Sequence, residues 1–186
     1  MKRREILKYT AYVTGAALSA PLISSILSGC QSEAASTAAD SALTFFSGKE
    51  FKQLKAIVDA ILPKTDSPSA TEVGVHQMID TMVGTVYRGD DQKKYKEGFD
   101  VLLQHLGNFA SLKSEKQLEV LSALSRSESN ETNDARDALL DIKQQTVAYY
   151  LTTEEIGKNY LNYLPVPGDY EACISLESVG GKAWAL

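Results

Sequence analysis

Apolar residues recur every three or four positions along most of the chain, and this spacing places them on one face of an α-helix. The clearest series lies between residues 51 and 62 and consists of Phe51, Leu54, Ile57, Val58, Ile61 and Leu62. Ser47 and Glu50 precede this series with the spacing of a capping box. Pro63 follows it, and a proline disfavours helical geometry in the residue before it. The pattern therefore predicts a first helix that begins after Ser47 and ends before Pro63.

The same spacing predicts a second and a third helix. The second covers residues 71–87, and Ser69 and Glu72 form a further capping-box pattern at its start. The third covers residues 91–107 and follows the turn sequence Arg88-Gly89-Asp90-Asp91, in which an aspartate is expected to cap the helix. The side chains expected to face the core are Val75, Ile79, Met82, Val83 and Val86 in the second helix and Tyr95, Phe99, Leu102, Leu103 and Leu106 in the third.

Two more helices follow on either side of a polar segment, residues 125–133. The fourth is predicted to begin at Ser114, capped together with Gln117, and the fifth to run from Asp134 into Tyr150. The side chains expected to face the core are Leu118, Leu121 and Leu124 in the fourth helix and Leu139, Leu140, Ile142, Val147 and Tyr150 in the fifth. No run in this part of the chain alternates apolar and polar residues as a β-strand would.

The C-terminal residues have a different pattern. Five of the nine tyrosines and the single tryptophan lie in the range from Tyr149 to Trp184, which also contains two prolines. Glu154 and Glu155 follow two threonines, which is typical of a capped helix start with acidic residues in its first turn. Beyond them, aromatic residues and prolines predict an irregular segment laid over a surface, either of this domain or of a partner. We predict an all-α single domain of about five helices with an irregular Tyr/Pro-rich C-terminal segment.

The first thirty residues have the pattern of an export signal. A basic start containing Arg3 and Arg4 leads into a stretch without charge from Tyr9 to Gly29, which ends in Leu27-Ser28-Gly29-Cys30. The adjacent arginines resemble a twin-arginine signal. The last four residues resemble a lipobox, at which the signal is cut between Gly29 and Cys30 and the new N-terminal cysteine is acylated. The alternative is a retained anchor helix, since the uncharged stretch is long enough to span a bilayer, although Pro21 would interrupt such a helix.

This interpretation divides the chain into three parts: a signal peptide at 1–29, a flexible tether at 30–46 and a helical domain at 47–186. The domain would lie outside the cytoplasm, facing the periplasm, and would be held to a membrane through Cys30. Gln31, which follows that cysteine, is not the aspartate associated with retention in the inner membrane. The sequence therefore favours the outer membrane.

Composition excludes several classes of function. The whole chain has a formal net charge of −5, and removal of the basic signal makes the remainder more acidic, so nucleic acid is not an expected partner. CxxC, CxxCH, GxGxxG and P-loop patterns are absent from the sequence. Cys173 is interpreted as a small buried apolar residue; the alternative is a disulfide with Cys30.

Other polar residues do not form a convincing catalytic or metal-binding set. His76 and His105 lie on different predicted helices and lack a ligand spacing, so structural or surface roles are expected. Asp134, Asp137 and Asp141, with Glu131 nearby, share one helical face; this is interpreted as a solvated face, with half of a metal site as the alternative. No catalytic, cofactor-binding or metal-binding residue is predicted.

Two stretches of the sequence, which we call the signature stretches, resemble a known family. The first is Ile61-Leu62-Pro63-Lys64-Thr65-Asp66-Ser67-Pro68-Ser69-Ala70, followed by Gly74-Val75. The second is Tyr150-Leu151-Thr152-Thr153-Glu154-Glu155-Ile156-Gly157, followed by Tyr163-Leu164-Pro165-Val166-Pro167-Gly168. With the twin-arginine pattern, they make the chain resemble the small subunit of membrane-bound gluconate 2-dehydrogenase, often called subunit 3. The resemblance covers nearly all of residues 45–175.

The resemblance implies a role in a complex. In this family a large flavoprotein of the glucose–methanol–choline type holds FAD and oxidises a sugar or sugar acid, and a cytochrome c or quinone accepts the electrons. The small subunit stabilises the flavoprotein and supplies the export signal, so that the folded, FAD-loaded partner is exported with it. The residues expected at the partner interface are Tyr150, Thr153, Glu154, Tyr163, Pro165, Pro167 and Gly168.

Two alternatives remain at this point. The chain could be a free-standing envelope lipoprotein that acts as a binding or scaffold module, although a small cofactor-free domain has little need to fold before export. It could also be an enzyme itself, which would require a convergent set of polar residues that the sequence does not display. The lipobox also departs from relatives with plain signals, so the chain is expected to anchor the complex directly.

Overall fold

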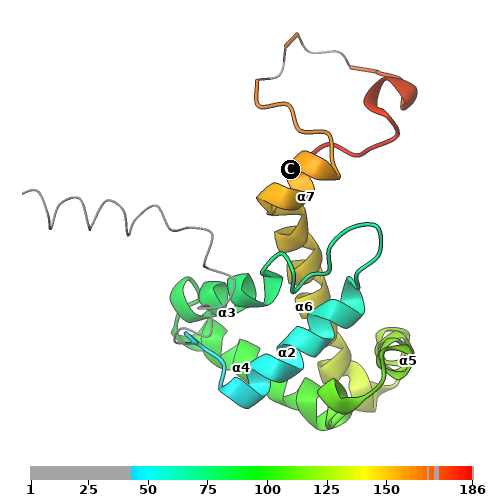
Figure 1. Cartoon of the computed structure of the whole chain (residues 1–186). Helices are drawn as coiled ribbons and strands as arrows, with labels where there is room; N and C mark the ends of the chain where they lie inside the picture. The colour runs from blue at the N-terminus through cyan, green and yellow to red at the C-terminus, as the bar shows by residue number, and fades with distance from the viewer. Residues whose placement is uncertain (1–42, 167, 170–171, 186) are drawn as a thin grey trace, which may run out of the picture. The chain divides into compact units, whose positions relative to one another are not determined.

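The computed structural model describes residues 43–166, 168–169 and 172–185. Over these residues the chain forms six α-helices: α2 (Gly48–Ile61), α3 (Val75–Thr85), α4 (Gly89–Leu106), α5 (Ser114–Ser125), α6 (Asn133–Thr152) and α7 (Glu154–Asn159) (Figure 1). Three short 3-10 turns accompany them, η1 (Phe109–Ser111), η2 (Asn130–Thr132) and η3 (Glu177–Val179). No β-strand occurs among the described residues, and the prediction of an all-α domain is confirmed. Arg3, Arg4, Cys30 and Pro167 lie outside the described residues.

The helices pack around α6, which contacts α2, α3, α4, α5 and α7. Its apolar side chains pack against α2 and α4, and α4 can approach α6 closely since a Cβ at Gly98 would lie 3.5 Å from that of Ala138. The largest fully buried side chains are Phe99, Phe109, Leu54, Ile57, Ile79, Leu102, Ile142 and Ile156. Burial of each such side chain stabilises the fold by about 1.5–3 kcal/mol.

The start of α2 forms as predicted. The Ser47 amide donates to the Glu50 carboxylate at 2.8 Å, and the Glu50 amide donates to the Ser47 hydroxyl at 3.5 Å, which completes the capping box. The buried face of α2 consists of Phe51, Leu54, Ile57 and Val58. The helix ends before Pro63, as the sequence predicts.

Residues 43–46, which the sequence places in the tether, belong to the folded body. The Asp80 carboxylate on α3 accepts hydrogen bonds from the amides of Thr44 (2.7 Å), Phe45 (3.1 Å) and Phe46 (2.9 Å), and from the Thr44 hydroxyl (2.7 Å). Phe46 is buried and packs against Phe99, with ring centroids 4.8 Å apart. Gly84 lies one turn after Asp80, and a Cβ there would come within 2.7 Å of the Thr44 Cβ. Helix α3 is therefore shaped to seat this segment.

Three predicted helix caps are wrong, although α5 begins at Ser114 as predicted. The Ser69–Glu72 box forms, with the Ser69 amide 2.8 Å from the Glu72 carboxylate, but it closes a turn that ends at Gly74, and α3 begins only at Val75. The φ of 79° at Gly74 separates the turn from the helix.

The other two starts lack the predicted side-chain caps. Arg88 is the N-cap of α4, so Asp90 and Asp91 lie within the first turn. Their negative charges stabilise the helix there by interacting with the positive end of its dipole. Lys113 rather than Ser114 is the N-cap of α5. The Gln117 side chain donates instead to the Phe109 carbonyl at 3.1 Å.

Four side chains predicted to face the core are exposed: Val86, Leu118, Leu140 and Val147. Val86 lies beyond the end of α3. Leu140 and Val147 each follow a buried residue, Leu139 and Thr146, and successive helical residues point about 100° apart, so both cannot face the same core. Thr146 takes the inward position because its hydroxyl donates to the Ile142 carbonyl at 2.7 Å, which satisfies its polar atom.

The C-terminal part contains the capped helix start that the sequence predicts, but Cys173 is not buried as expected. It contains a short helix, α7, with Thr153 at its N-cap and Glu154 and Glu155 in its first turn. Cys173 is exposed rather than buried, because it lies in the irregular segment after α7 and not against the helices. None of the helices in the described part of the chain is long and apolar enough to cross a membrane.

Candidate partner-binding surface

The fold brings the two signature stretches together, although they are about eighty residues apart in the sequence. The Tyr150 hydroxyl, near the end of α6, lies 3.0 Å from the Ser67 hydroxyl and donates to the Pro68 carbonyl at 2.7 Å. Figure 1 shows the loop between α2 and α3 beside the C-terminal part of α6, from which α7 continues. We call the exposed surface formed by this loop, α7 and residues 160–166 the signature surface.

The loop of the signature surface is held in one conformation by its own hydrogen bonds. The Ala70 amide donates to the Leu62 carbonyl at 3.0 Å, which closes the loop at its base. The Asp59 carboxylate on α2 accepts from the Thr71 amide at 3.0 Å and from its hydroxyl at 2.7 Å. Because the backbone is fixed at both ends and at Pro68, the loop offers a preformed surface to a partner.

An open recess of about 360 Å³ lies between the loop and α7. Its lining consists of Lys64, Thr65, Asp66, Ser67, Pro68, Glu72, Glu155 and Tyr160. Lys64 and Glu72 form an exposed ion pair at 2.6 Å, and their hydrogen bond raises the pKa of Lys64 and lowers that of Glu72. The remaining carboxylates, Asp66 and Glu155, give the recess an excess of acidic side chains.

Of the predicted interface residues, Tyr150 has a different place from the one expected. It is only 8% exposed, and its hydroxyl is engaged with the loop, so the side chain supports the signature surface from beneath. Thr153 is half-buried, and its hydroxyl donates to the Tyr150 carbonyl at 2.8 Å. Glu154 is exposed and pairs with Lys158 at 2.5 Å, and this hydrogen bond lowers the pKa of Glu154.

Tyr163, Pro165 and Gly168 are exposed beyond α7, as an interface requires. Between them lie two exposed apolar side chains that the sequence analysis did not single out, Leu164 and Val166, the latter 80% exposed. The signal that could have identified them is their position: they alternate with prolines where helical periodicity ends, so no helix face buries them.

The remaining candidates have structural or solvated positions. His76 is buried beside the Phe51 ring, with centroids 5.2 Å apart, and burial, together with the charge of Lys55, lowers its pKa to about 4. His105 is exposed in the last turn of α4. The acidic face formed by Glu131, Asp134, Asp137 and Asp141 is exposed to solvent. Among the described residues, no group of three or more histidine, cysteine or acidic side chains could hold a metal ion.

Comparison with known proteins gives one match. A family model described as "Gluconate 2-dehydrogenase subunit 3" matches residues 48–168, nearly two thirds of the chain. The matched range contains the six helices of the described residues and both signature stretches. Curated proteins and solved structures give no match to the chain.

Proposed function

This chain belongs to the gluconate 2-dehydrogenase subunit 3 family, and we propose that it is a non-catalytic accessory subunit that stabilises, exports and membrane-anchors an FAD-dependent dehydrogenase. The partner is a flavoprotein of the glucose–methanol–choline type that oxidises a sugar or sugar acid. In this proposal FAD and the substrate bind to the partner, and a cytochrome c or quinone takes the electrons. The family itself consists of subunits of a dehydrogenase complex, which supports the general role.

The observation that carries the proposal is the convergence of the two signature stretches in one exposed, preformed surface. Surface loops that are held rigidly but do not bury their apolar side chains are typical of a site that a partner covers. Tyr163, Leu164 and Val166 are exposed next to a recess lined from both stretches. An interface core of this kind is enriched in aromatic residues and poor in charged ones, with polar groups at its rim.

Export and anchoring rest on the N-terminal residues. Arg3 and Arg4 would direct the chain, with its folded and cofactor-loaded partner, through the twin-arginine route, and acylated Cys30 would hold the complex at the outer membrane, facing the periplasm. In this proposal C30A removes the complex from the outer membrane, whereas R3K/R4K removes both subunits from the periplasm. If the flavoprotein still reaches the periplasm in the R3K/R4K variant, export by this chain is wrong.

The experiment that tests the proposed function is purification of the tagged full chain from its native membrane in mild detergent. We expect a stoichiometric flavoprotein, identified by mass spectrometry and by the absorbance spectrum of a bound flavin, that reduces a dye when one sugar of a panel is supplied. A colourless chain that purifies alone would contradict the proposal. That result would favour a free-standing envelope lipoprotein acting as a binding or scaffold module.

A further inference from the structure

After α7 the structure describes an outgoing limb at 162–166 and a returning limb at 172–185. Asn162 joins the limbs at their base. Its amide donates to the Ala183 carbonyl at 2.8 Å, and its carbonyl accepts from the Ala185 amide at 2.9 Å. Figure 1 shows the outgoing limb leaving α7 and the returning limb ending beside the same end of that helix.

The Asn162 side chain completes this closure. Its Nδ2 donates to the Val179 carbonyl at 3.0 Å and to the Lys182 carbonyl at 2.7 Å. Both acceptors are carbonyls, so the orientation of the amide group is determined by its partners. Gly180 and Gly181, with φ of 61° and 70°, make the turn that presents these carbonyls, a backbone geometry that other residues rarely adopt. Asn162 therefore holds the two limbs together through both its backbone and its side chain.

The clasped limbs display apolar side chains to solvent rather than burying them. The exposed set is Tyr163, Leu164 and Val166 on the outgoing limb and Ile174, Leu176 and Trp184 on the returning limb. Leu176 is 76% exposed. A loop that is held closed by backbone and side-chain hydrogen bonds while its large apolar residues face outward is a candidate for a permanent interface, since monomers rarely expose such a set.

We propose that these two limbs form a preformed docking loop, clasped by Asn162, which inserts its apolar side chains into the dehydrogenase subunit. The inference rests on the proposed function and names a part of the interface that the family match does not contain, because the match ends at residue 168. The returning limb, with Leu176 and Trp184, lies outside the matched range. Asn162 is a positioning residue: it does not need to touch the partner.

Two observations favour a protein occupant over a lipid surface. The loop is continuous with the signature surface, because Tyr160 at its stem lines the recess together with the first signature stretch. The described limbs carry one acidic side chain, Glu177, and one lysine, Lys182, so they have no net positive charge that would attract them to anionic lipid. The clasp lowers the entropy that the limbs would otherwise lose on binding, so it raises affinity without adding a contact.

The first test is hydroxyl-radical footprinting of the native complex against the free full chain in the same detergent. We expect oxidation of Tyr163, Leu176 and Trp184 to fall several-fold in the complex, while oxidation of Leu118 on α5 does not change. If a flavoprotein co-purifies but these three side chains are oxidised equally in both states, the docking loop is wrong and the proposed function stands. If no flavoprotein co-purifies, the proposed function fails, and the inference fails with it. Equal protection by lipid vesicles without the flavoprotein would also overturn the inference.

The second test is N162A, with N159A as its matched control, because the side chain of Asn159 is exposed and only its carbonyl accepts a bond, from Lys182. We expect N162A to weaken binding of the purified flavoprotein about tenfold, to speed hydrogen exchange at the Ala185 amide, and to leave the unfolding temperature unchanged. N159A should bind as the wild type does. Wild-type affinity in N162A, together with faster exchange, would show that the clasp does not contribute to docking.

Discussion

The Asp80 carboxylate offers the sharpest test of how residues 43–46 are held on α3, because it accepts four hydrogen bonds from this segment. Each of its oxygens accepts two hydrogen bonds: Oδ1 from the Phe45 and Phe46 amides, and Oδ2 from the amide and hydroxyl of Thr44. The side chain is only 4% exposed. D80N keeps the shape but replaces one oxygen by an NH2 group, which faces donors rather than acceptors. At least one backbone amide then has no acceptor.

The size of the effect follows from these contacts. Hydrogen bonds to a charged group contribute about 1.5–3 kcal/mol each, and a buried donor left without an acceptor costs about 1–3 kcal/mol. If the Thr44 hydroxyl turns to accept from the new NH2 group, a single amide is lost and the other bonds lose their charge. We therefore expect D80N to lower the free energy of unfolding by about 3 kcal/mol. For a domain of this size that corresponds to a fall in Tm of roughly 10 °C.

The pH dependence provides an independent check. Burial acts to raise the pKa of Asp80, but the hydrogen bonds from Phe46, Thr44 and Phe45 outweigh it and hold the pKa below its usual value of 3.8. A depressed folded-state pKa contributes stability that is present above 3.8 and is lost as the pH falls through the lower folded value. The difference in stability between wild type and D80N should therefore shrink below this pH.

The assay is thermal unfolding of the full chain in mild detergent, followed by far-UV circular dichroism at several pH values. D141N is the matched control, because Asp141 is an exposed aspartate on α6, and its Tm should equal that of the wild type. Chymotrypsin should also cleave D80N faster beside Phe45 and Phe46. A Tm within about 1 °C of wild type in D80N would refute the conclusion that this carboxylate seats the segment.

Three further substitutions test other parts of the fold by the same thermal unfolding measurement. G84A should destabilise by about 1–3 kcal/mol, since its Cβ would lie 2.7 Å from a neighbouring side-chain carbon, whereas G98A, with a contact of 3.5 Å, should be neutral or slightly stabilising; equal effects would contradict the packing. In wild type, stability should fall as the pH drops from 6.5 towards 4, because the unfolded chain protonates His76 more readily than the folded chain does, and H76L should flatten this fall. If stability falls with pH as steeply in H76L as in wild type, His76 is not the cause of the fall. Y150F should cost about 1 kcal/mol and speed proteolysis of the loop before α3, while Y149F should do neither.

Local patterns in the sequence predicted the elements well where one principle dominated. The capping box at Ser47 and Glu50 and the stop at Pro63 define α2, because both act through neighbouring backbone atoms. The same reasoning was wrong at Ser69, where the box closes a turn and Gly74 delays the helix. Periodicity also assigned Leu118 to the core, yet it is 58% exposed, since α5 is covered on one side only and the sequence does not reveal which helices flank it.

The contacts of the candidate site could be predicted even less well than the helices, because they join segments that are far apart in the sequence. The two signature stretches could be found in the sequence, but their contact could not, because it depends on how α6 passes the loop after α2. Tyr150 was predicted at the interface for its place in a signature stretch, and the structure instead puts its hydroxyl on the Pro68 carbonyl. Asp80 was not singled out at all, since its partners are backbone amides some 35 residues away, which no sequence pattern reports.

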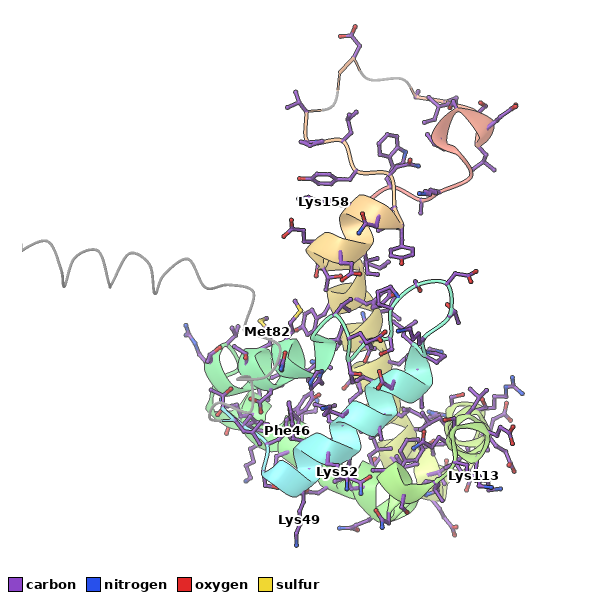
Figure 2. All side chains as sticks on the ribbon, viewed as in Figure 1. Phe46, Lys49, Lys52, Met82, Lys113 and Lys158 are labelled. Carbon is purple, nitrogen blue, oxygen red and sulfur yellow. The ribbon has the colours of Figure 1, made fainter. Side chains whose placement is uncertain are left out.

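The measurement that tests the central claim most directly is lysine cross-linking of the native complex, read by mass spectrometry. Lys64 and Lys158 flank the signature surface, whereas Lys113 and Lys116 lie at the start of α5; Figure 2 shows Lys158 on α7 and Lys113 beside α5. All four side chains are exposed, so access of the cross-linker does not favour either pair. We predict cross-links from Lys64 and Lys158 to an FAD-containing dehydrogenase and none from the α5 pair. Cross-links from Lys113 and Lys116 alone would contradict the assignment of the signature surface as the docking site.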